Sequence, residues 1–188
     1  MNGKLQVKTI SKKSLIEITA TELIILALLG VFAVVLRANL RIPLQIPGHH
    51  GLEVMAILLL GRGISKSSFA SSISCFFAAL MIFFPFMGFK DPFLPLYYIL
   101  MGATIDFLFK TIKNSKTNVL LFSLIGAIAY MIIPLGRLFI HFTVGYPYQS
   151  FIKLGYLYPV VSHFLFGATG AVIAVGLIFS ANKIKSKN

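Results

Sequence analysis

Long apolar runs alternate with short polar breaks along this chain. The breaks fall at Pro43 to Gly48, Gly61 to Ser68, Gly88 to Pro92, Lys113 to Asn118 and Gly145 to Gly155. The runs between them predict six helical segments, at about residues 17–36, 51–64, 68–88, 93–112, 118–143 and 157–180. A helix needs about 20 apolar residues to cross a bilayer, and continuous rather than alternating apolar runs disfavour all-β spans. The second segment has only about 14 residues, so we expect a short or tilted helix packed inside the bundle.

Composition supports this pattern. Of the 188 residues, 57% are hydrophobic and 12% are charged, and the mean hydropathy is +0.90. Soluble domains have about a quarter of their residues charged, so a soluble domain, a disordered chain and a nucleic-acid-binding domain are excluded. We therefore predict an all-α integral membrane protein, a single six-helix transmembrane domain over residues 1–188, multi-pass in the plasma membrane and without a nucleic-acid partner.

Basic residues are unevenly distributed between the two predicted sides of the membrane. With the N-terminus inside, most of the 17 lysines and arginines fall on the inner side. The exceptions on the outer side are Arg37, Arg41, Lys90, Arg137 and Lys153. Because cytoplasmic loops of membrane proteins are enriched in lysine and arginine, both termini are predicted to be cytoplasmic. The net charge of +12 then reflects topology and contact with anionic lipid.

The loop between the first two segments concentrates polar residues on the outer side. Its candidate binding residues, with the flanking helix ends, are Arg37, Asn39, Arg41, Gln45, His49, His50 and Glu53. Pro43 and Pro47 stiffen the loop, and Gly48 permits a tight turn beside the histidines. One interpretation is a surface turn with solvated charges. We favour a binding site, because the histidines and Glu53 open directly into an apolar helix.

Further ionisable residues lie in the outer parts of the fifth and sixth segments. Arg137 and His141 are four residues apart and share a helical face, and His163 lies at a similar depth. Ionisable groups inside a membrane usually face the bundle interior and mark a ligand path. Alternatively, Arg137 extends to the interface and His163 bonds a carbonyl. Their shared depth favours one outward-facing pocket, in which Tyr146 is a candidate for stacking on a planar ligand.

Other features favour structural roles. Asp106 is four residues before Lys110, which predicts a pair within one helix. Small residues repeat every four positions at Ala70, Ser74 and Ala78, and again at Gly167 with Ala171 and Gly170 with Ala174. Such faces allow helices to approach closely, either within the monomer or against a second membrane protein.

No enzyme signature is present. The sequence lacks a GxSxG motif, a phosphate-binding P-loop and a paired-acid motif, and His49-His50-Gly51-Leu52-Glu53 is not the HExxH zinc motif. We expect neither catalysis nor a cofactor. If a metal binds, the candidate ligands are His49, His50, Glu53 and His163.

The arrangement resembles the S-component, the substrate-binding membrane subunit, of energy-coupling factor (ECF) transporters. The resemblance rests on the basic N-terminus, the loop from Arg41 to Gly48, and the short second segment that ends at Leu60 to Gly63. It implies six helices, cytoplasmic termini and a first loop that covers an outward pocket. It further implies uptake of a vitamin or related micronutrient, together with a coupling transmembrane subunit and two cytoplasmic ATPase subunits. The family often carries paired alanines at spacing four on the first helix; here Ala27, Gly30 and Ala33 stand at spacing three.

The ligand class is less sharply defined. Arginine and lysine on the outer side favour an anionic or carboxylate-bearing ligand, which they would bind through charge-assisted hydrogen bonds. The histidines leave open uptake of a metal ion or a metallated tetrapyrrole. Metal-specific members of the family carry histidine at the extreme N-terminus, and Met1-Asn2-Gly3 has none. A membrane-embedded metal-dependent enzyme and an assembly subunit are the remaining alternatives.

Overall fold

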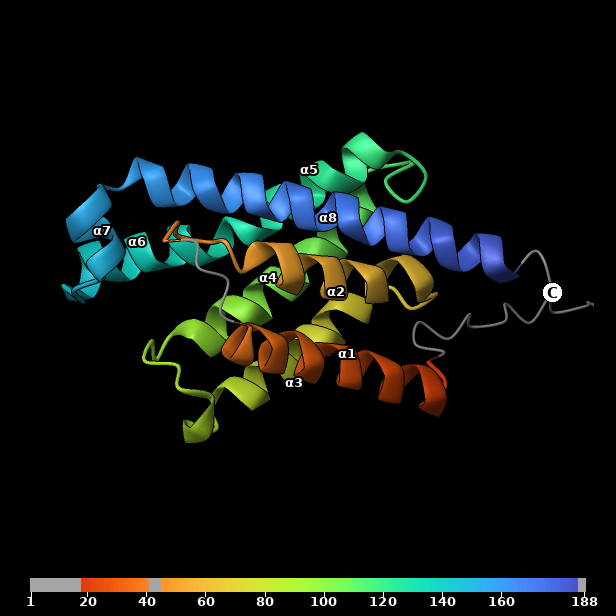
Figure 1. Cartoon of the computed structure of the whole chain (residues 1–188), viewed down its shortest axis with the longest axis horizontal. Helices are drawn as coiled ribbons and strands as arrows, with labels where there is room; N and C mark the ends of the chain where they lie inside the picture. The colour runs from red at the N-terminus through yellow and green to blue at the C-terminus, as the bar shows by residue number, and fades with distance from the viewer. Residues whose placement is uncertain (1–17, 41–44, 186–188) are drawn as a thin grey trace, which may run out of the picture.

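The computed structural model describes residues 18–40 and 45–185 (Figure 1). The elements are α1 (Ala20–Asn39), α2 (Gly51–Ile64), α3 (Ala70–Ile82), the 3-10 helix η1 (Pro85–Met87), α4 (Leu94–Thr111), α5 (Val119–Tyr130), α6 (Ile132–Val144), α7 (Gln149–Leu154) and α8 (Leu157–Lys185). No strand occurs within the described ranges, so the predicted all-α class is confirmed there. Arg41, a predicted site residue, lies outside the described residues, as do Pro43 and the basic N-terminal segment.

Three described helical segments are long and apolar enough to cross a bilayer, which is consistent with a membrane protein. They are Ala20–Asn39, Val119–Val144 and Leu157–Lys183. Helix α3 is apolar but shorter, and α2 has 14 residues over the predicted range. The predicted segment at 68–88 is divided into α3 and η1.

The helix boundaries have local chemical causes. The Thr19 hydroxyl accepts the Glu22 N–H at the start of α1, and the Asn118 side chain accepts two N–H groups at the start of α5. Helices α5 and α6 come from one apolar run that is interrupted at Met131. Proline has no N–H and its ring clashes with the carbonyl four residues earlier. Pro134 stands four residues after Tyr130, where α5 ends.

The connections gather at two ends of the molecule. Figure 1 places residues 45–50 before α2, the α3–α4 connection and all of α7 toward one end, here called the α7 end. The α2–α3 and α4–α5 connections, the start of α1 and the end of α8 lie toward the opposite end. Chain segments that are distant in sequence therefore share each end.

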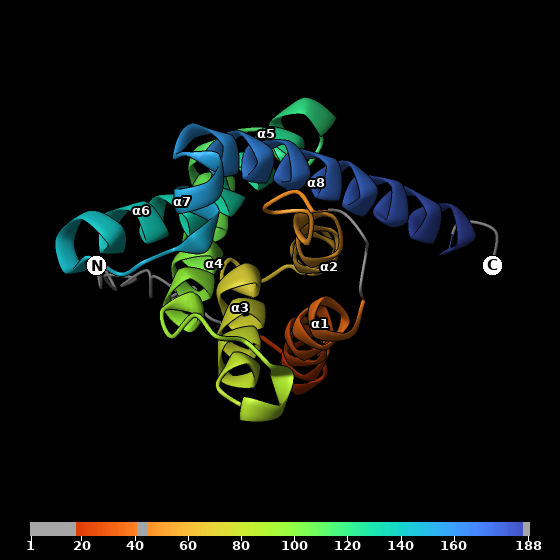
Figure 2. The same cartoon turned by 60° about the vertical axis from the view of Figure 1, so that its left-hand side comes forward.

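Helix α2 occupies the centre of this arrangement. Figure 2 shows α2 between α1 and α8, and ten of its 14 residues are buried. A helix that is apolar on all sides is stable only when it is enclosed. By contrast, α1 exposes Leu28 and Phe32 and α8 exposes Leu165, as expected of surfaces that face lipid.

The small-residue faces pack within the monomer. A Cβ atom added to Gly30 in α1 would lie 1.9 Å from the Ser74 carbonyl oxygen in α3. Gly170 in α8 also lies close to α2, because a Cβ there would be 2.4 Å from the Gly51 carbonyl oxygen. Ala33 of α1 is fully buried. Of the two roles considered for these faces, internal packing is the one that the structure shows.

Asp106 pairs with other helices rather than with Lys110 in its own. Its carboxylate accepts the backbone N–H groups of Ser71 at 3.1 Å and Ser72 at 2.7 Å, at the N-terminus of α3. The Nε atom of Arg62 in α2 lies 3.4 Å away as an ion pair. Lys110 is exposed. The predicted Asp106–Lys110 pair is wrong because Asp106 faces the bundle interior, where a helix N-terminus and Arg62 compete for its charge.

A second set of polar contacts holds the α2–α3 loop at the end of the molecule opposite α7. The Glu22 carboxylate of α1 accepts the Ser65 hydroxyl and the Lys66 N–H. The Lys116 ammonium, from the α4–α5 loop, donates to the Ser65 carbonyl at 3.1 Å. Partial burial, and then the Arg62 charge, lower the pKa of Lys116 below its usual value. The opposite end is thus a polar junction between α1, α2 and the α4–α5 loop.

Replacement of Asp106 by alanine tests the buried pair. Loss of one partner leaves Arg62 buried without its counter-charge, which costs about 3 kcal/mol. Lys110→Ala is the matched control and should change stability by less than about 0.5 kcal/mol, because Lys110 is exposed. Denaturant unfolding in detergent micelles measures both variants. Equal losses of stability in the two variants would instead support the Asp106–Lys110 pair that the sequence predicted.

Replacement of Gly30 by alanine tests the close approach of α1 and α3. The added Cβ would overlap the Ser74 carbonyl oxygen, and overpacking of this kind costs about 1–3 kcal/mol. Gly176→Ala is the control, since a Cβ at Gly176 meets no atom within 4 Å. A drop in the melting temperature is expected for the Gly30 variant alone. A similar drop in both would mean that helix contact at Gly30 is not the cause.

Candidate functional site

A cavity of about 510 Å³ lies at the α7 end, between the 45–50 loop, α6, α7 and α8. We call it the α7 cavity. Its lining residues are Gln45, Ile46, Pro47, Gly48, His49, His50, Arg137, Gln149, Ser150, Lys153, Leu154 and His163. Small-molecule sites in proteins have volumes of about 300–1,000 Å³, so the cavity is large enough for one such ligand.

Five predicted site residues line this cavity. They are Gln45, His49, His50, Arg137 and His163. Lys153, which the charge pattern placed on the same side, also lines it. The predicted convergence of the first loop with the fifth and sixth segments is therefore observed for these residues.

The 45–50 loop is a tight turn that rests on α8. The Gly51 N–H donates to the Gly48 carbonyl at 2.8 Å, and Gly48 has a φ of +82°, which glycine adopts without strain. A Cβ added at Gly48 would lie 2.6 Å from Nδ1 of His163. The loop therefore contacts the His163 imidazole through a position where no side chain fits.

His163 is fixed by two contacts in the structure. Its Nδ1 atom lies 2.6 Å from the Pro159 carbonyl, and its ring stacks on Tyr130 with centroids 5.0 Å apart. A carbonyl can only accept, so Nδ1 carries the proton and Nε2 is the acceptor of the neutral ring. The sequence predicted either a carbonyl contact or a pocket position for His163. The structure has both, since His163 bonds the Pro159 carbonyl and also lines the α7 cavity.

The two adjacent histidines have different partners. His49 donates through Nδ1 to the Ile46 carbonyl at 2.8 Å, and its ring lies 4.0 Å from that of His50. His50 contacts the Glu53 carboxylate through Nδ1 at 2.5 Å. Glu53 is buried, and its Oε2 atom has no hydrogen-bond partner among the described residues. Glu53 does not line the α7 cavity. It bonds the His50 ring, which does line it.

Arg137 is held by a residue that sequence reasoning did not select. Its Nε donates to Oδ2 of Asp91 at 2.8 Å, and its guanidinium carbon lies 5.5 Å from the centre of the Tyr148 ring. Asp91 precedes α4 in a segment that the sequence marked only as a break. The chain has only five acidic residues. An acid on the same predicted side of the membrane as Arg137 was therefore a candidate partner for it, and this was the signal that could have identified Asp91.

Two tyrosines complete the surroundings of Asp91. The Tyr148 hydroxyl donates to Oδ1 of Asp91 at 3.4 Å, and the Tyr97 and Tyr148 hydroxyls are 3.0 Å apart. Burial, then Tyr97 and the Asp91 charge, raise the pKa of Tyr148 above its usual value. The phenol thus stays protonated and able to donate.

The remaining predicted residues lie outside the cavity lining. Arg37 donates to the Tyr98 hydroxyl at 2.8 Å, and the Asn39 amide bonds the Val35 carbonyl of its own helix. Nδ1 of His141 donates to the Tyr146 carbonyl at 2.9 Å. These contacts anchor α1 and the α6–α7 turn, which are structural tasks.

The candidate metal ligands do not form a common group. Among the described residues, no set of three or more histidine, cysteine or acidic side chains has metal-binding proximity. His50 and Glu53 bond each other, and His163 is fixed to a carbonyl.

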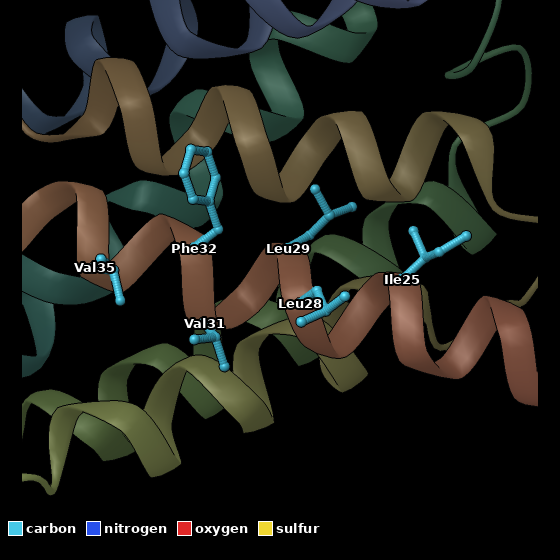
Figure 3. Close-up of a pocket in the computed structure, with 6 residues that line it drawn as sticks. All are labelled: Ile25, Leu28, Leu29, Val31, Phe32 and Val35. Atoms are coloured by element: carbon cyan, nitrogen blue, oxygen red, sulfur yellow. The ribbon is translucent and has the colours of Figure 1, made fainter.

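A second cavity, of about 500 Å³, follows α1. Figure 3 shows its lining, in which Leu29 and Phe32 point toward α2 and Val31 points away from it. All the lining residues are apolar: Ile25, Leu28, Leu29, Val31, Phe32 and Val35. With no polar side chain to orient a solute, this groove suits hydrocarbon chains.

The chain matches no known protein family, no curated protein and no solved structure.

A double-mutant cycle tests the seat of the 45–50 loop. Gly48→Ala forces a side chain into a left-handed conformation and against His163, which should lower stability by about 2 kcal/mol. In a His163→Ala background the clash is relieved, so the same change should cost about half as much. Thermal unfolding in detergent gives the four values. Strict additivity would show that Gly48 and His163 are not in contact.

Proposed function

We propose that this protein is the substrate-binding membrane subunit of an ECF-type importer, which captures a small micronutrient in the α7 cavity. The carrying observation is that one cavity is lined by residues from the 45–50 loop, α6, α7 and α8. Gathering polar side chains from distant parts of an apolar chain is what ligand binding requires. Contact with lipid alone would not favour such a cluster of polar side chains.

The proposed topology has six spans formed by α1, α2, α3, α4, the α5–α6 pair and α8. The opposite end is then cytoplasmic and the α7 cavity faces outward. Basic residues support this orientation, since the α2–α3 and α4–α5 connections, the helix ends before them and the end of α8 lie at the opposite end. These segments carry Arg62, Lys66, Lys110, Lys113, Lys116 and Lys183. Positive residues are enriched on the cytoplasmic side of membrane proteins. The proposed role in uptake from outside the cell implies a location in the plasma membrane.

The proposed partners supply the energy for transport. A coupling transmembrane subunit would join this chain to two cytoplasmic ATPase subunits, and the sequence has no P-loop of its own. Ligand bound at the α7 end would be released inside when the loaded subunit topples in the membrane, as the resemblance implies.

The proposed ligand is a vitamin or a related organic precursor. Arg137 and Lys153 can form charge-assisted hydrogen bonds with an anionic group, while Gln45, Gln149 and Ser150 can both donate and accept. Metal-based alternatives receive less support, because the described histidines bond to carbonyls or to Glu53 rather than converging.

Native mass spectrometry of the purified full chain tests the proposal. One small organic molecule per chain is expected to copurify. Arg137→Gln should lower its occupancy by removing an anion-binding donor from the cavity. Lys110→Gln, an exposed substitution at the opposite end, should retain the ligand.

Two outcomes would contradict the proposal. A chain that carries no molecule, and whose melting temperature no candidate micronutrient raises, would not be a capture subunit. Stoichiometric zinc together with turnover of a lipid or peptide would favour the membrane-embedded enzyme instead.

A further inference from the structure

We propose that the α7 cavity selects a singly charged carboxylate, and that Asp91 is the positioning residue that prepares Arg137 for it. The inference rests on the proposed function only in taking the α7 cavity as a ligand site. Asp91 does not line that cavity; it acts through Arg137.

The first step is the free edge of the Arg137 guanidinium. Arginine has five N–H donors in a planar fork. The contact with Asp91 uses Nε, at 2.8 Å, and no other hydrogen bond of Arg137 occurs among the described residues. The two terminal nitrogens remain available, and a carboxylate can accept from both at once.

The second step is the rigidity of Asp91. Its Oδ1 accepts the Phe93 N–H at 3.1 Å and the Tyr148 hydroxyl at 3.4 Å, while Oδ2 accepts from Arg137. The Tyr148 ring also covers the guanidinium, and the Tyr97 hydroxyl supports Tyr148. Arg137 is therefore ordered before any ligand arrives, which removes much of the side-chain entropy that binding would otherwise cost.

The third step is the local charge. The described charged groups that line the α7 cavity or bond to its lining are Arg137, Lys153, Asp91 and the His50–Glu53 pair. Asp91 offsets the Arg137 charge, and Glu53 offsets His50 when that ring is protonated. At most one positive charge, that of Lys153, is then left to balance, because Glu53 beside a neutral His50 would offset it. A monoanionic carboxylate matches it, whereas a doubly charged phosphate would bring one negative charge too many beside Asp91.

Asp91→Asn is the variant that isolates this role. Asparagine keeps an oxygen that can accept the Phe93 N–H and the Tyr148 hydroxyl, so the start of α4 is preserved. It removes the charge that orients Arg137. Arg137→Gln removes the donor itself, and the double variant shows whether Asp91 acts through Arg137.

The experiment titrates the purified full chain in detergent with benzoate, benzamide and phenyl phosphate, by saturation-transfer NMR. Benzoate should bind at least tenfold more tightly than either of the others. Asp91→Asn should weaken benzoate about tenfold through the loss of positioning and leave benzamide unchanged. Because it also removes a negative charge beside Arg137, it should narrow the preference for benzoate over phenyl phosphate. In the Arg137→Gln background, Asp91→Asn should have no further effect on benzoate, and melting temperatures recorded alongside monitor folding.

Several results would overturn the inference. Failure of benzoate to bind, or phenyl phosphate binding as tightly as benzoate, would refute the carboxylate assignment. An unchanged benzoate affinity in Asp91→Asn would refute positioning, as would an equal loss for benzamide or an additive loss in the double variant. The proposed function can fail while this inference holds. If benzoate binds selectively but no micronutrient copurifies, the α7 cavity is a carboxylate site and the protein is not a capture subunit.

Discussion

The short helix α2 has to be enclosed by its neighbours, and most of the architecture follows from that constraint. It has 14 residues, too few for an ordinary span, and it buries an ionisable side chain near each end, Glu53 and Arg62. In an apolar environment each needs a partner. His50 meets Glu53 at one end, and Asp106 of α4 meets Arg62 at the other. The close helix contacts, of which Gly170 on Gly51 is one, allow this enclosure.

The α7 cavity depends on the same helix. Because α2 starts inside the bundle, the turn before it carries Gly48 onto His163 and leaves His49 and His50 in the cavity lining. Arg137 reaches the cavity from α6, where Asp91 and Tyr148 hold it. The site therefore combines a turn fixed by α2 with an arginine fixed by the start of α4.

Much of the fold was predictable because prolines, glycines and charges interrupt the apolar runs. The segment at 51–64 coincides with α2 for this reason. The break at Met131 was missed inside a continuous apolar run, although Pro134 was a usable signal. Site residues were predicted where they occupy similar positions in the predicted spans, and two of these, Arg137 and His163, line one cavity. Asp91 and the true partners of Asp106 depend on contacts between distant segments, and helical spacing holds no information about those.

The interruption at Met131 weakens the helix that carries Arg137. Pro134 has no N–H, so it cannot donate to the Tyr130 carbonyl four residues earlier. The turn stays helical around this gap, because the Met131 N–H donates to the Ala127 carbonyl and the Leu135 N–H donates to the Met131 carbonyl. Arg137 therefore follows, by about one turn, a point where its own helix lacks a backbone hydrogen bond. Its contact with Asp91, at the start of α4, gives it a second attachment that does not depend on α5.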